Sequence, residues 1–332
     1  MTLTLRVRRQ TLLVALIALP CMALLAPAAW AQAQAYPSKP IKFIITHAAG
    51  GLPDTVARVY AQKLTERLGQ AVVVDNKPGA NGMVAAQAMA TAPKDGYTFM
   101  VTDGSTFSIN PVVHKNLSYD YKRDFVTVSL AARAPLYLAL NPKTPANNLR
   151  ELIALAKAKP GVLTYGSSGI GSTHHLTMEA FKSALGLDIV HVPFKGTGQS
   201  VPALIGGQVD MLFSALPSLS GFVKNNQVRL VGNNAAKRSA QEPQVPAIAE
   251  LIPGFDFAPI VTVFASTGTP QAAIDRISAE MTLIAKLPDV VLLLSNAGIE
   301  AIGGSPAELS RAMNEEIERL GKAVQNANLK QE

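Results

Sequence analysis

Two glycine-rich turns, each lying between an apolar strand pattern and a helical pattern, constrain this chain more than any other feature. The first covers residues 44–55 (IITHAAGGLPDT) and the second residues 163–174 (LTYGSSGIGSTH). Where a strand passes through a turn into a helix, the unpaired backbone N–H groups of the helix start point to one spot, and the helix dipole adds positive charge there. The turns lie about 120 residues apart, which predicts two lobes that bind one negatively charged small molecule between them.

Strand-like apolar runs alternate with helical patterns through most of the chain. Residues 41–46, 71–76 and 97–103 have strand patterns separated by helical segments, the βαβαβ order that is typical of a parallel sheet. The α/β pattern repeats over residues 134–250, so we predict an α/β fold with two lobes, each a mixed, mainly parallel sheet flanked by helices. Further strands are expected at residues 136–141, 162–167, 188–194, 209–215 and 228–233, and one more, 260–266, before C-terminal helices.

The first 31 residues have the pattern of a secretory signal peptide. A basic start precedes an apolar run over residues 11–29, which ends in Ala-x-Ala sequences. Pro20 and Pro27 interrupt the run and disfavour a membrane anchor, and Pro20 before Cys21 disfavours a lipoprotein leader. We therefore expect residues 1–31 to be removed and the protein to be exported to the periplasm.

Cysteine usage and charge exclude several classes of protein. Cys21 is the one cysteine of the sequence, so the mature chain has neither disulfides nor thiol chemistry. The sequence has 30 Lys and Arg against 23 Asp and Glu, and removing the three leader arginines leaves 27 against 23, a net charge of +4. This mild excess helps to attract small anions. The basic residues are scattered without interleaved aromatics, so we expect no nucleic-acid partner.

The turns differ in the side chains they offer. The first has no Lys or Arg, so an anion there would rest on backbone N–H groups, hydroxyls and water. Asp54 is interpreted as a helix cap, or alternatively as a residue that repels excess charge or accepts from a ligand N–H. The second turn is rich in hydroxyls but matches neither G-x-S-x-G nor G-x-G-x-x-G, which disfavours a hydrolase and a dinucleotide site. Its Ser172 also fits a plain helix cap.

A third glycine turn follows the strand at 188–194. Gly196 and Thr197 stand at a helix start, where their backbone could contact an anion, whereas Lys195 is interpreted as a solvated loop residue. The histidines show no metal-ligand spacing, and adjacent side chains on a helix point in different directions. We therefore expect no metal, no cofactor and no catalytic group. The histidines are His47, His114, His174, His175 and His191.

A series of short motifs occurs in order along the mature chain: 36–41 (YPSKPI), Gly50-Gly51 with Asp54 and 57–58 (AR), 76–82 (NKPGANG), 95–98 (DGYT), 165–172 (YGSSGIGS), 191–196 (HVPFKG), 206–210 (GGQVD), 253–256 (PGFD) and 268–270 (GTP). Together they resemble the Bug family of periplasmic solute receptors, the binding components of tripartite tricarboxylate transporters.

The resemblance implies a two-lobed Venus-flytrap fold of the type II periplasmic-binding kind. It places lobe one at residues 36–133 with 254–332, and lobe two at residues 134–253. Members of the family bind small carboxylates, including di- and tricarboxylates, acidic amino acids, and aromatic or nicotinic acids. The partners it implies are a small anionic carboxylate and the membrane subunits of a transporter, and we expect the receptor to be a monomer without enzymatic activity.

The turns and the resemblance together predict which residues bind the ligand. Asp210 matches a family position but also fits a structural role. Alternative functions are a ligand-sensing module for a membrane signalling protein, which only the partner would distinguish, and a secreted hydrolase using Ser167 or Ser172. The candidates are His47, Ala48, Ala49, Gly50, Gly51 and Asp54 in lobe one, and Ser167, Gly169, Ser172, Gly196, Thr197 and Asp210 in lobe two.

The chain departs from the family pattern near the expected cleft. His47 stands where the family usually has an aromatic residue, Ala49 where it often has proline, and residues 260–264 (IVTVF) replace an aromatic Trp-x-Gly segment. We hypothesise that neutral His47 accepts a hydrogen bond from a ligand donor, or that protonated His47 pairs with a second carboxylate. The departures predict a shifted specificity.

Overall fold

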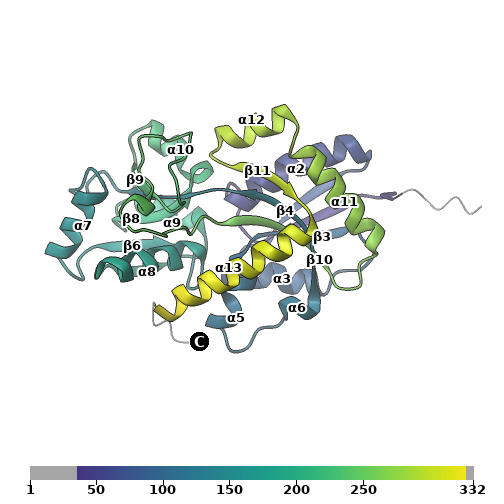
Figure 1. Ribbon diagram of the computed structural model, residues 1–332, viewed down its shortest axis with the longest axis horizontal. Coiled ribbons are helices and arrows are strands. Elements are labelled where there is room, and N and C mark those ends of the chain that lie inside the picture. The colour runs from purple at the N-terminus through teal and green to yellow at the C-terminus, as the bar shows by residue number, and fades with distance from the viewer. Residues whose placement is uncertain (1–35, 327–332) are drawn as a thin grey trace, which may run out of the picture. The chain divides into compact units, whose positions relative to one another are not determined.

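The computed structural model describes residues 36–326, so the predicted leader, residues 1–31, lies outside the described residues. From Lys39 onward the chain forms one compact unit that contains two β-sheets. Each sheet carries helices on its faces, as Figure 1 shows. The predicted two-lobed α/β class is therefore confirmed.

The first lobe is built on a sheet of six strands within the described residues, in the order β11-β4-β10-β3-β1-β2. Strands β1, β2 and β3 pair in parallel, as the βαβαβ pattern predicts, whereas β10 is antiparallel to both β3 and β4. Its elements are β1 (Ile41–Ile45), α2 (Leu52–Leu68), β2 (Val72–Asn76), η1 (Ala80–Gly82), α3 (Met83–Ala90), β3 (Thr98–Asp103), α4 (Ser105–Ser108), α5 (Asn110–Val113), α6 (Tyr121–Asp124), β4 (Phe125–Arg133), β10 (Ile260–Ser266), α11 (Gln271–Ile284), α12 (Pro288–Asn296), β11 (Glu300–Gly304) and α13 (Pro306–Asn326).

The second lobe is built on a sheet of five strands in the described part of the chain, in the order β7-β6-β8-β5-β9. Strand β6 is parallel to β7 and β8, and β5 is antiparallel to β8 and β9. Its elements are β5 (Leu136–Leu140), α7 (Leu149–Ala158), β6 (Thr164–Ser167), α8 (Thr173–Leu185), β7 (Val190–Pro193), α9 (Thr197–Ile205), β8 (Met211–Ala215), α10 (Leu216–Lys224), β9 (Arg229–Asn233) and η2 (Ile248–Glu250).

Helix α2 illustrates how the sequence determines these elements. Pro53 stands in its first turn, where a missing N–H costs nothing. Val56, Tyr60 and Leu64 recur at helical spacing and are fully buried against the sheet. The helix ends at Gly69, whose φ of 67° is the left-handed conformation that glycine adopts without strain. Each of these boundaries could be predicted from the sequence.

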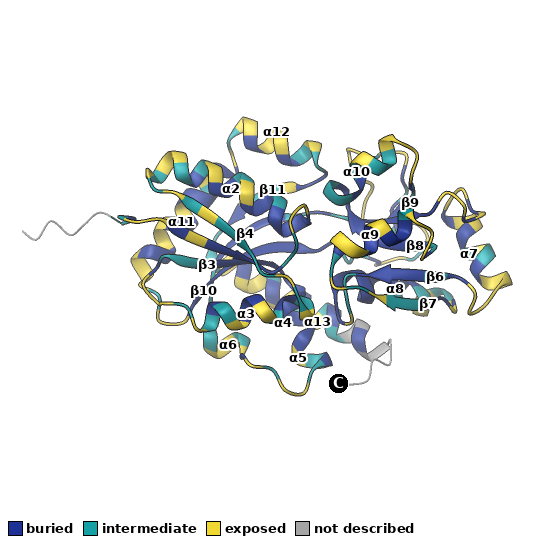
Figure 2. Cartoon of the chain, turned by 180° about the vertical axis from the view of Figure 1, so that it is seen from behind, coloured by how far each residue is buried: buried dark blue, intermediate teal, exposed yellow. Residues whose placement is uncertain are grey.

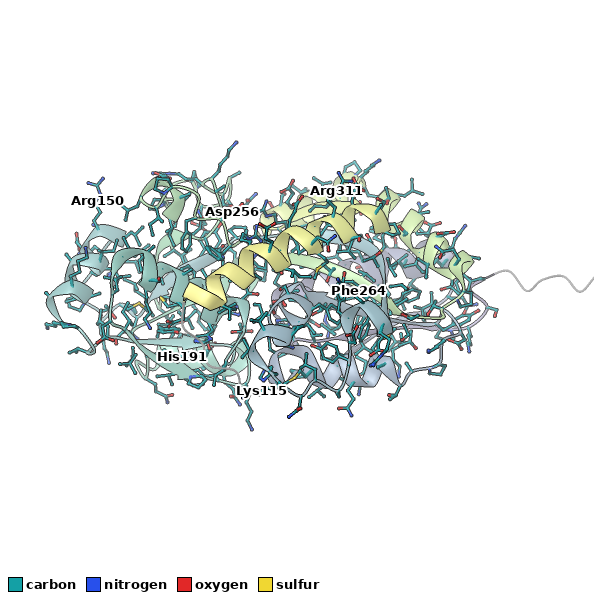
Figure 3. All side chains as sticks on the ribbon, turned by 60° about the horizontal axis from the view of Figure 1, so that its bottom comes forward. Lys115, Arg150, His191, Asp256, Phe264 and Arg311 are labelled. Atoms are coloured by element: carbon teal, nitrogen blue, oxygen red, sulfur yellow. The ribbon has the colours of Figure 1, made fainter. Side chains whose placement is uncertain are left out.

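The cores lie between the sheets and their helices, and the outer helix faces are exposed (Figure 2). In the first lobe Phe107 packs among aromatic rings, with ring centres 4.8 Å from Phe264 and 4.7 Å from Phe125. Figure 3 labels Phe264 within this lobe. The second lobe has an aliphatic core, in which Leu204, Leu212 and Leu219 are fully buried.

The C-terminal part differs from the prediction of one strand followed by helices. Strand β11 was not expected, because its sequence EAIGG is short and ends in glycines. It pairs with β4 at the edge of the sheet, across a register shift between Ala301 and Gly304. Helix α13 then contacts both β4 in the first lobe and α8 in the second. No helix in the described residues has the length and apolarity to cross a bilayer.

Candidate functional site

The first glycine turn connects β1 to α2 and depends on a left-handed residue. Gly50 has a φ of 79°, which favours glycine, and Gly51 N–H donates to the carbonyl of Ala48 at 3.2 Å. The Asn76 amide, at the end of the neighbouring strand β2, donates to the His47 carbonyl at 2.9 Å. The turn is therefore fixed at both ends before any ligand is present.

Hydrogen bonds to the Asp54 side chain hold this turn in place. Its buried carboxylate accepts hydrogen bonds from Gly50 N–H at 2.9 Å, Arg58 Nε at 3.0 Å and Asn76 Nδ2 at 2.9 Å. Burial alone would raise the pKa of Asp54, but the hydrogen bonds from Arg58, Gly50 and Asn76 outweigh it and lower that pKa. With its oxygens occupied in this way, Asp54 positions the turn.

The hydroxyls of the second turn are used within the turn itself. Ser172 caps α8, because its Oγ accepts from His175 N–H at 3.2 Å and donates to the Gly169 carbonyl at 2.7 Å. Ser167 Oγ accepts from Gly169 N–H at 3.1 Å and contacts His191 Nε2 at 2.7 Å. Ser167 is only 1% exposed. A substrate carbonyl could not reach it, so the serine–histidine contact is structural.

A stack of three rings supports the second turn. The ring of His191, labelled in Figure 3, lies 4.7 Å from that of Tyr165 and 4.1 Å from that of His175. Burial lowers the pKa of His175 to about 4 and that of His191 to about 3, so both are neutral near pH 7. Neutral His175 accepts from Gly171 N–H at 3.1 Å. These contacts agree with a structural role for His175 and His191.

Hydrogen bonds join the turns of the two lobes. Ser218 Oγ, at the start of α10, donates to the Gly50 carbonyl at 3.1 Å. On another part of the lobe boundary, Asn81 Nδ2 donates to the Gly171 carbonyl at 2.9 Å. Gly82 is the N-cap residue of α3, and Asn81, with a φ of 46°, reaches the second lobe.

A small cavity lies where the lobes meet. Its volume is about 10 Å³, which is room for about one water molecule. The first turns of four helices, α2, α8, α9 and α10, contribute to its lining, and no Lys or Arg is among its lining residues in the described chain. The lining consists of His47, Gly51, Leu52, Pro53, Asp103, Leu136, Thr173, His174, Thr197, Ser214, Ala215, Ser218 and Pro259.

The structure brings only some of the predicted residues to this cavity. His47, Gly51 and Thr197 line it, and Ala48 lies beside the start of α9, where a Cβ added at Gly198 would be 3.9 Å from the Ala48 Cβ. Ala49 and Gly50 are exposed on the first turn, and Gly196 is the N-cap residue of α9.

The remaining predicted residues lie apart from the cavity. Ser167, Gly169 and Ser172 shape the second turn, and Asp54 lies behind the first. Asp210 accepts from Thr164 N–H at 2.8 Å, at the opposite end of β6 from the glycine turn. Its contacts fit the structural alternative stated for it.

Sequence reasoning missed five polar residues of the cavity: Asp103, Thr173, His174, Ser214 and Ser218. Asp103 and Ser214 stand at or next to the carboxyl ends of β3 and β8, and ligands of open α/β sheets bind outside those ends. Applying that rule to each predicted strand would have found both. His174 precedes the stacked His175 on α8 and points the other way, into the cavity.

Asp103 is the charged centre of the cavity. It is 4% exposed, and its Oδ2 lies 3.4 Å from His47 Nε2. Burial would raise the pKa of Asp103, but the charge and hydrogen bond of His47, aided by Ser105, lower it. Burial lowers the pKa of His174 to about 4. Among the described residues, no group of His, Cys, Asp or Glu is arranged to hold a metal ion.

Glu316 on α13 is a second buried carboxyl near Asp103. It packs against Gly104 and accepts from Ser108 Oγ at 3.2 Å, while its Oε2 has no partner among the described residues. Burial, followed by the negative charge of Asp103, raises the pKa of Glu316 to about 7. Folding therefore favours its protonated form, and the associated stability is present below the ordinary pKa and lost as the pH rises through 7.

We predict that Glu316→Gln stabilises the protein at alkaline pH. The amide keeps the size of the side chain and cannot acquire the buried charge, so the free energy of unfolding should rise by about 2 kcal/mol at pH 8. Urea unfolding at pH 8 and pH 4.5 measures this, with the exposed neighbour in Glu315→Gln as control. A gain of equal size at both pH values would contradict the explanation.

Two larger grooves lie away from the glycine turns. One, of about 600 Å³, is lined by the end of α8, residues 252–257 and α13. The other, of about 540 Å³, lies beside the Arg133–Asp256 ion pair, near the segments that connect the lobes. Neither combines helix starts from both lobes, as the cavity between the turns does.

Comparison with known proteins agrees with this arrangement. A model of the tripartite tricarboxylate transporter family receptor matches residues 56–329. Protein BugT of Bordetella pertussis is 32% identical over 91% of this chain and 94% of its own length. The structure of Rpa4515 from R. palustris with adipate superposes with a TM-score of 0.86, at 32% identity, over 88% of this chain and 98% of that one.

A further solved structure, MatC from Rhodopseudomonas palustris with bound malate, has a TM-score of 0.81 at 28% identity, over 87% of this chain and the whole of the other. These relatives are solute-binding proteins rather than enzymes, which confirms the receptor prediction and removes the hydrolase alternative. The family match, the two lobes and the helix starts that converge between them lead to one conclusion: this chain belongs to the tripartite tricarboxylate transporter family receptors, the Bug family of periplasmic solute-binding proteins.

Proposed function

We propose that this protein captures a small carboxylate between its two lobes and presents it to the membrane subunits of a tripartite tricarboxylate-type transporter. The convergence of four helix starts on one cavity that has no Lys or Arg in its lining carries this proposal. Such helix starts attract an anion through backbone N–H groups and dipoles. The adipate and malate named for the two similar structures are carboxylates and support the same class of ligand.

The lobes are proposed to move as the family's Venus-flytrap mechanism implies. We place lobe one at residues 36–133 with 254–332 and lobe two at 134–253, which agrees with the division of the strands between the two sheets. The cavity of about 10 Å³ is too small for a dicarboxylate, so the lobes must separate to admit one. A ligand that contacts both lobes then shifts the equilibrium toward the closed form.

The anchor for the carboxylate is proposed to be backbone rather than side chain. Residues 47–51 and Gly196 with Thr197 lie on opposite sides of the lobe boundary, and a Cβ built at Gly51 would be 3.8 Å from Thr197 Oγ1. Gly50 N–H and Gly51 N–H are bonded within the turn, so the other N–H groups of these segments are expected to bind the carboxylate, partly through water. We propose that the receptor works as a periplasmic monomer, exported by residues 1–31.

A thermal shift measurement tests this function. The protein, purified through unfolding to remove carried ligand and then refolded, is titrated with mono-, di- and tricarboxylates, acidic amino acids and aromatic acids. A compound that binds only the native state raises the melting temperature with its concentration. We expect a rise confined to one class of carboxylate. A flat response across all acids, from protein shown to be refolded, would contradict the proposal.

A substitution in the cavity makes the test specific. In Thr197→Asp the protein's own carboxylate would occupy the helix starts, so the thermal shift by the acid should be lost. Thr91→Asp, on an exposed residue after α3, is the matched control and should keep the full shift. Retention of binding in Thr197→Asp would place the anion elsewhere.

A further inference from the structure

The cavity between the lobes has two electrically different sides. The helix starts of α2, α8, α9 and α10 provide partial positive charge without any cationic side chain in the lining. The carboxylate of Asp103, at the end of β3, provides a full negative charge in the same cavity. A ligand that complements both sides carries a negative and a positive group of its own.

The hydrogen bonds of Asp103 leave one oxygen for such a group. Its Oδ1 accepts from Ser105 Oγ at 2.5 Å and from Ser105 N–H at 3.2 Å. Its Oδ2 has two long contacts, both of 3.4 Å, with His47 Nε2 and Thr173 Oγ1. Hydrogen bonds to a charged carboxylate are normally 2.7–2.9 Å, so Oδ2 can accept a stronger donor than it now has.

Ser214 is an independent sign that the cavity is built for a polar group. Its side chain is fully buried, lines the cavity, and its Oγ has no hydrogen-bond partner in the described part of the chain. A buried hydroxyl without a partner costs free energy, and a ligand that bonds with it recovers that cost. Its oxygen can accept from an ammonium group.

We propose that the ligand of this receptor is an amino-acid-type zwitterion, whose carboxylate lies at the helix starts and whose ammonium group is bound by Asp103 and Ser214. The inference rests on the proposed function and narrows its substrate class. Asp103 is then the residue that determines specificity, because it selects for the amine.

The same charges disfavour a second carboxylate at this position. Burial keeps His174 neutral near pH 7, and no Lys or Arg lines the cavity in the described residues. His47 Nε2 lies beside Asp103, 3.4 Å from its Oδ2. A dicarboxylate would place its second charge against Asp103, where repulsion is strong in a dry site.

Matched pairs of ligands test this inference. Each amino acid is compared with the acid that lacks only its amine: L-aspartate with succinate, L-glutamate with glutarate, L-alanine with propionate, and L-phenylalanine with 3-phenylpropionate. Calorimetric titration of the refolded full chain at pH 7 gives the affinity ratio within each pair. We expect one amino acid to bind at least about thirtyfold more tightly than its partner acid.

Two variants identify the residues responsible. Asp103→Asn keeps the shape and one acceptor oxygen, and should reduce the ratio to near one while leaving or improving the binding of the deaminated acid. Ser214→Ala removes a hydroxyl that has no hydrogen-bond partner among residues 36–326, and should reduce the ratio about three- to tenfold. Asp95→Asn, which changes an exposed aspartate paired with Lys39, is the control and should leave the ratio unchanged.

The outcomes separate the two proposals. Tight binding of a deaminated acid with no preference for its amino acid would overturn the zwitterion and leave the carboxylate receptor standing. An amino-acid preference that survives in Asp103→Asn would overturn the assignment to Asp103. Failure of every acid, aminated or not, to bind would overturn both the inference and the function on which it rests.

Discussion

Replacing Asp54 by alanine is expected to lower the free energy of unfolding by about 3 kcal/mol and to abolish measurable ligand binding. The carboxylate is only 2% exposed and accepts hydrogen bonds from Gly50, Arg58 and Asn76. Its loss leaves buried donors unpaired and frees the first glycine turn from its support. Urea unfolding measures the stability, and calorimetric titration measures the binding.

The pH dependence identifies the charge as the cause. The pKa of Asp54 is lowered from 3.8 by its partners, so its contribution to stability is present above that value and is lost as the pH falls through its lower folded pKa. The difference between wild type and Asp54→Ala should therefore shrink as the pH falls below 3.8 and through the lower folded pKa. Asp95→Ala, at an exposed ion pair with Lys39, should cost less than about 1 kcal/mol. Equal losses in both variants would contradict the buried-network explanation.

Gly303→Ala is expected to destabilise the protein by about 3–4 kcal/mol, the other large effect. Gly303 lies in β11 with a φ of 61°, and a Cβ there would meet the Ala285 Cβ, and would lie 2.9 Å from the Met281 carbonyl oxygen and 3.0 Å from the Thr282 Cα. The left-handed conformation costs about 1–2 kcal/mol for a residue with a Cβ, and the contact with helix α11 adds the rest.

Gly186 provides a matched control for this substitution. It ends α8 with a φ of 63°, and a Cβ there would meet nothing within 4 Å. Gly186→Ala should therefore cost only the conformational part, about 1 kcal/mol. Comparing the two variants by urea unfolding isolates the contribution of the clash. If both lost the same free energy, the packing of β11 on α11 would not explain the need for glycine at position 303.

Local signals predicted the fold where each element carries its own pattern. Helix α7 runs from Leu149 to Ala158, and its start carries a local signal, the side-chain cap Asn148. Strand β10 was expected at 260–266 and occupies those residues. Strand β11 was missed because its pairing depends on β4, which is more than 160 residues distant in sequence, rather than on its own EAIGG pattern.

The candidate site was predictable in its turns, and strand ends could have indicated Asp103 and Ser214 singly but not their meeting in one cavity. The turns could be predicted because glycines stand between a strand pattern and a helix start. Glycine is favoured where the backbone adopts a positive φ or approaches a ligand closely. Asp103 and Ser214 become neighbours in the cavity only through the meeting of the two lobes, and no spacing in the sequence indicates it. Ser167 and Ser172 show the converse: their hydroxyls suggested ligand contacts, yet local hydrogen bonds use them within the turn.

The turn hydroxyls are bonded within the turns. In the proposed site, the ligand carboxylate is therefore anchored by the backbone, and other side chains select among ligands. Backbone N–H groups at the helix starts belong to every residue type except proline, so the proposed anchor does not depend on a particular side-chain chemistry there. His47, Asp103 and Ser214 line the cavity, whereas His174 lines it and also bonds the Ser168 hydroxyl of the second turn at 2.6 Å. An engineer could therefore randomise positions 47, 103 and 214 as a library on the proposed carboxylate anchor, and obtain biosensors for different acids from one scaffold.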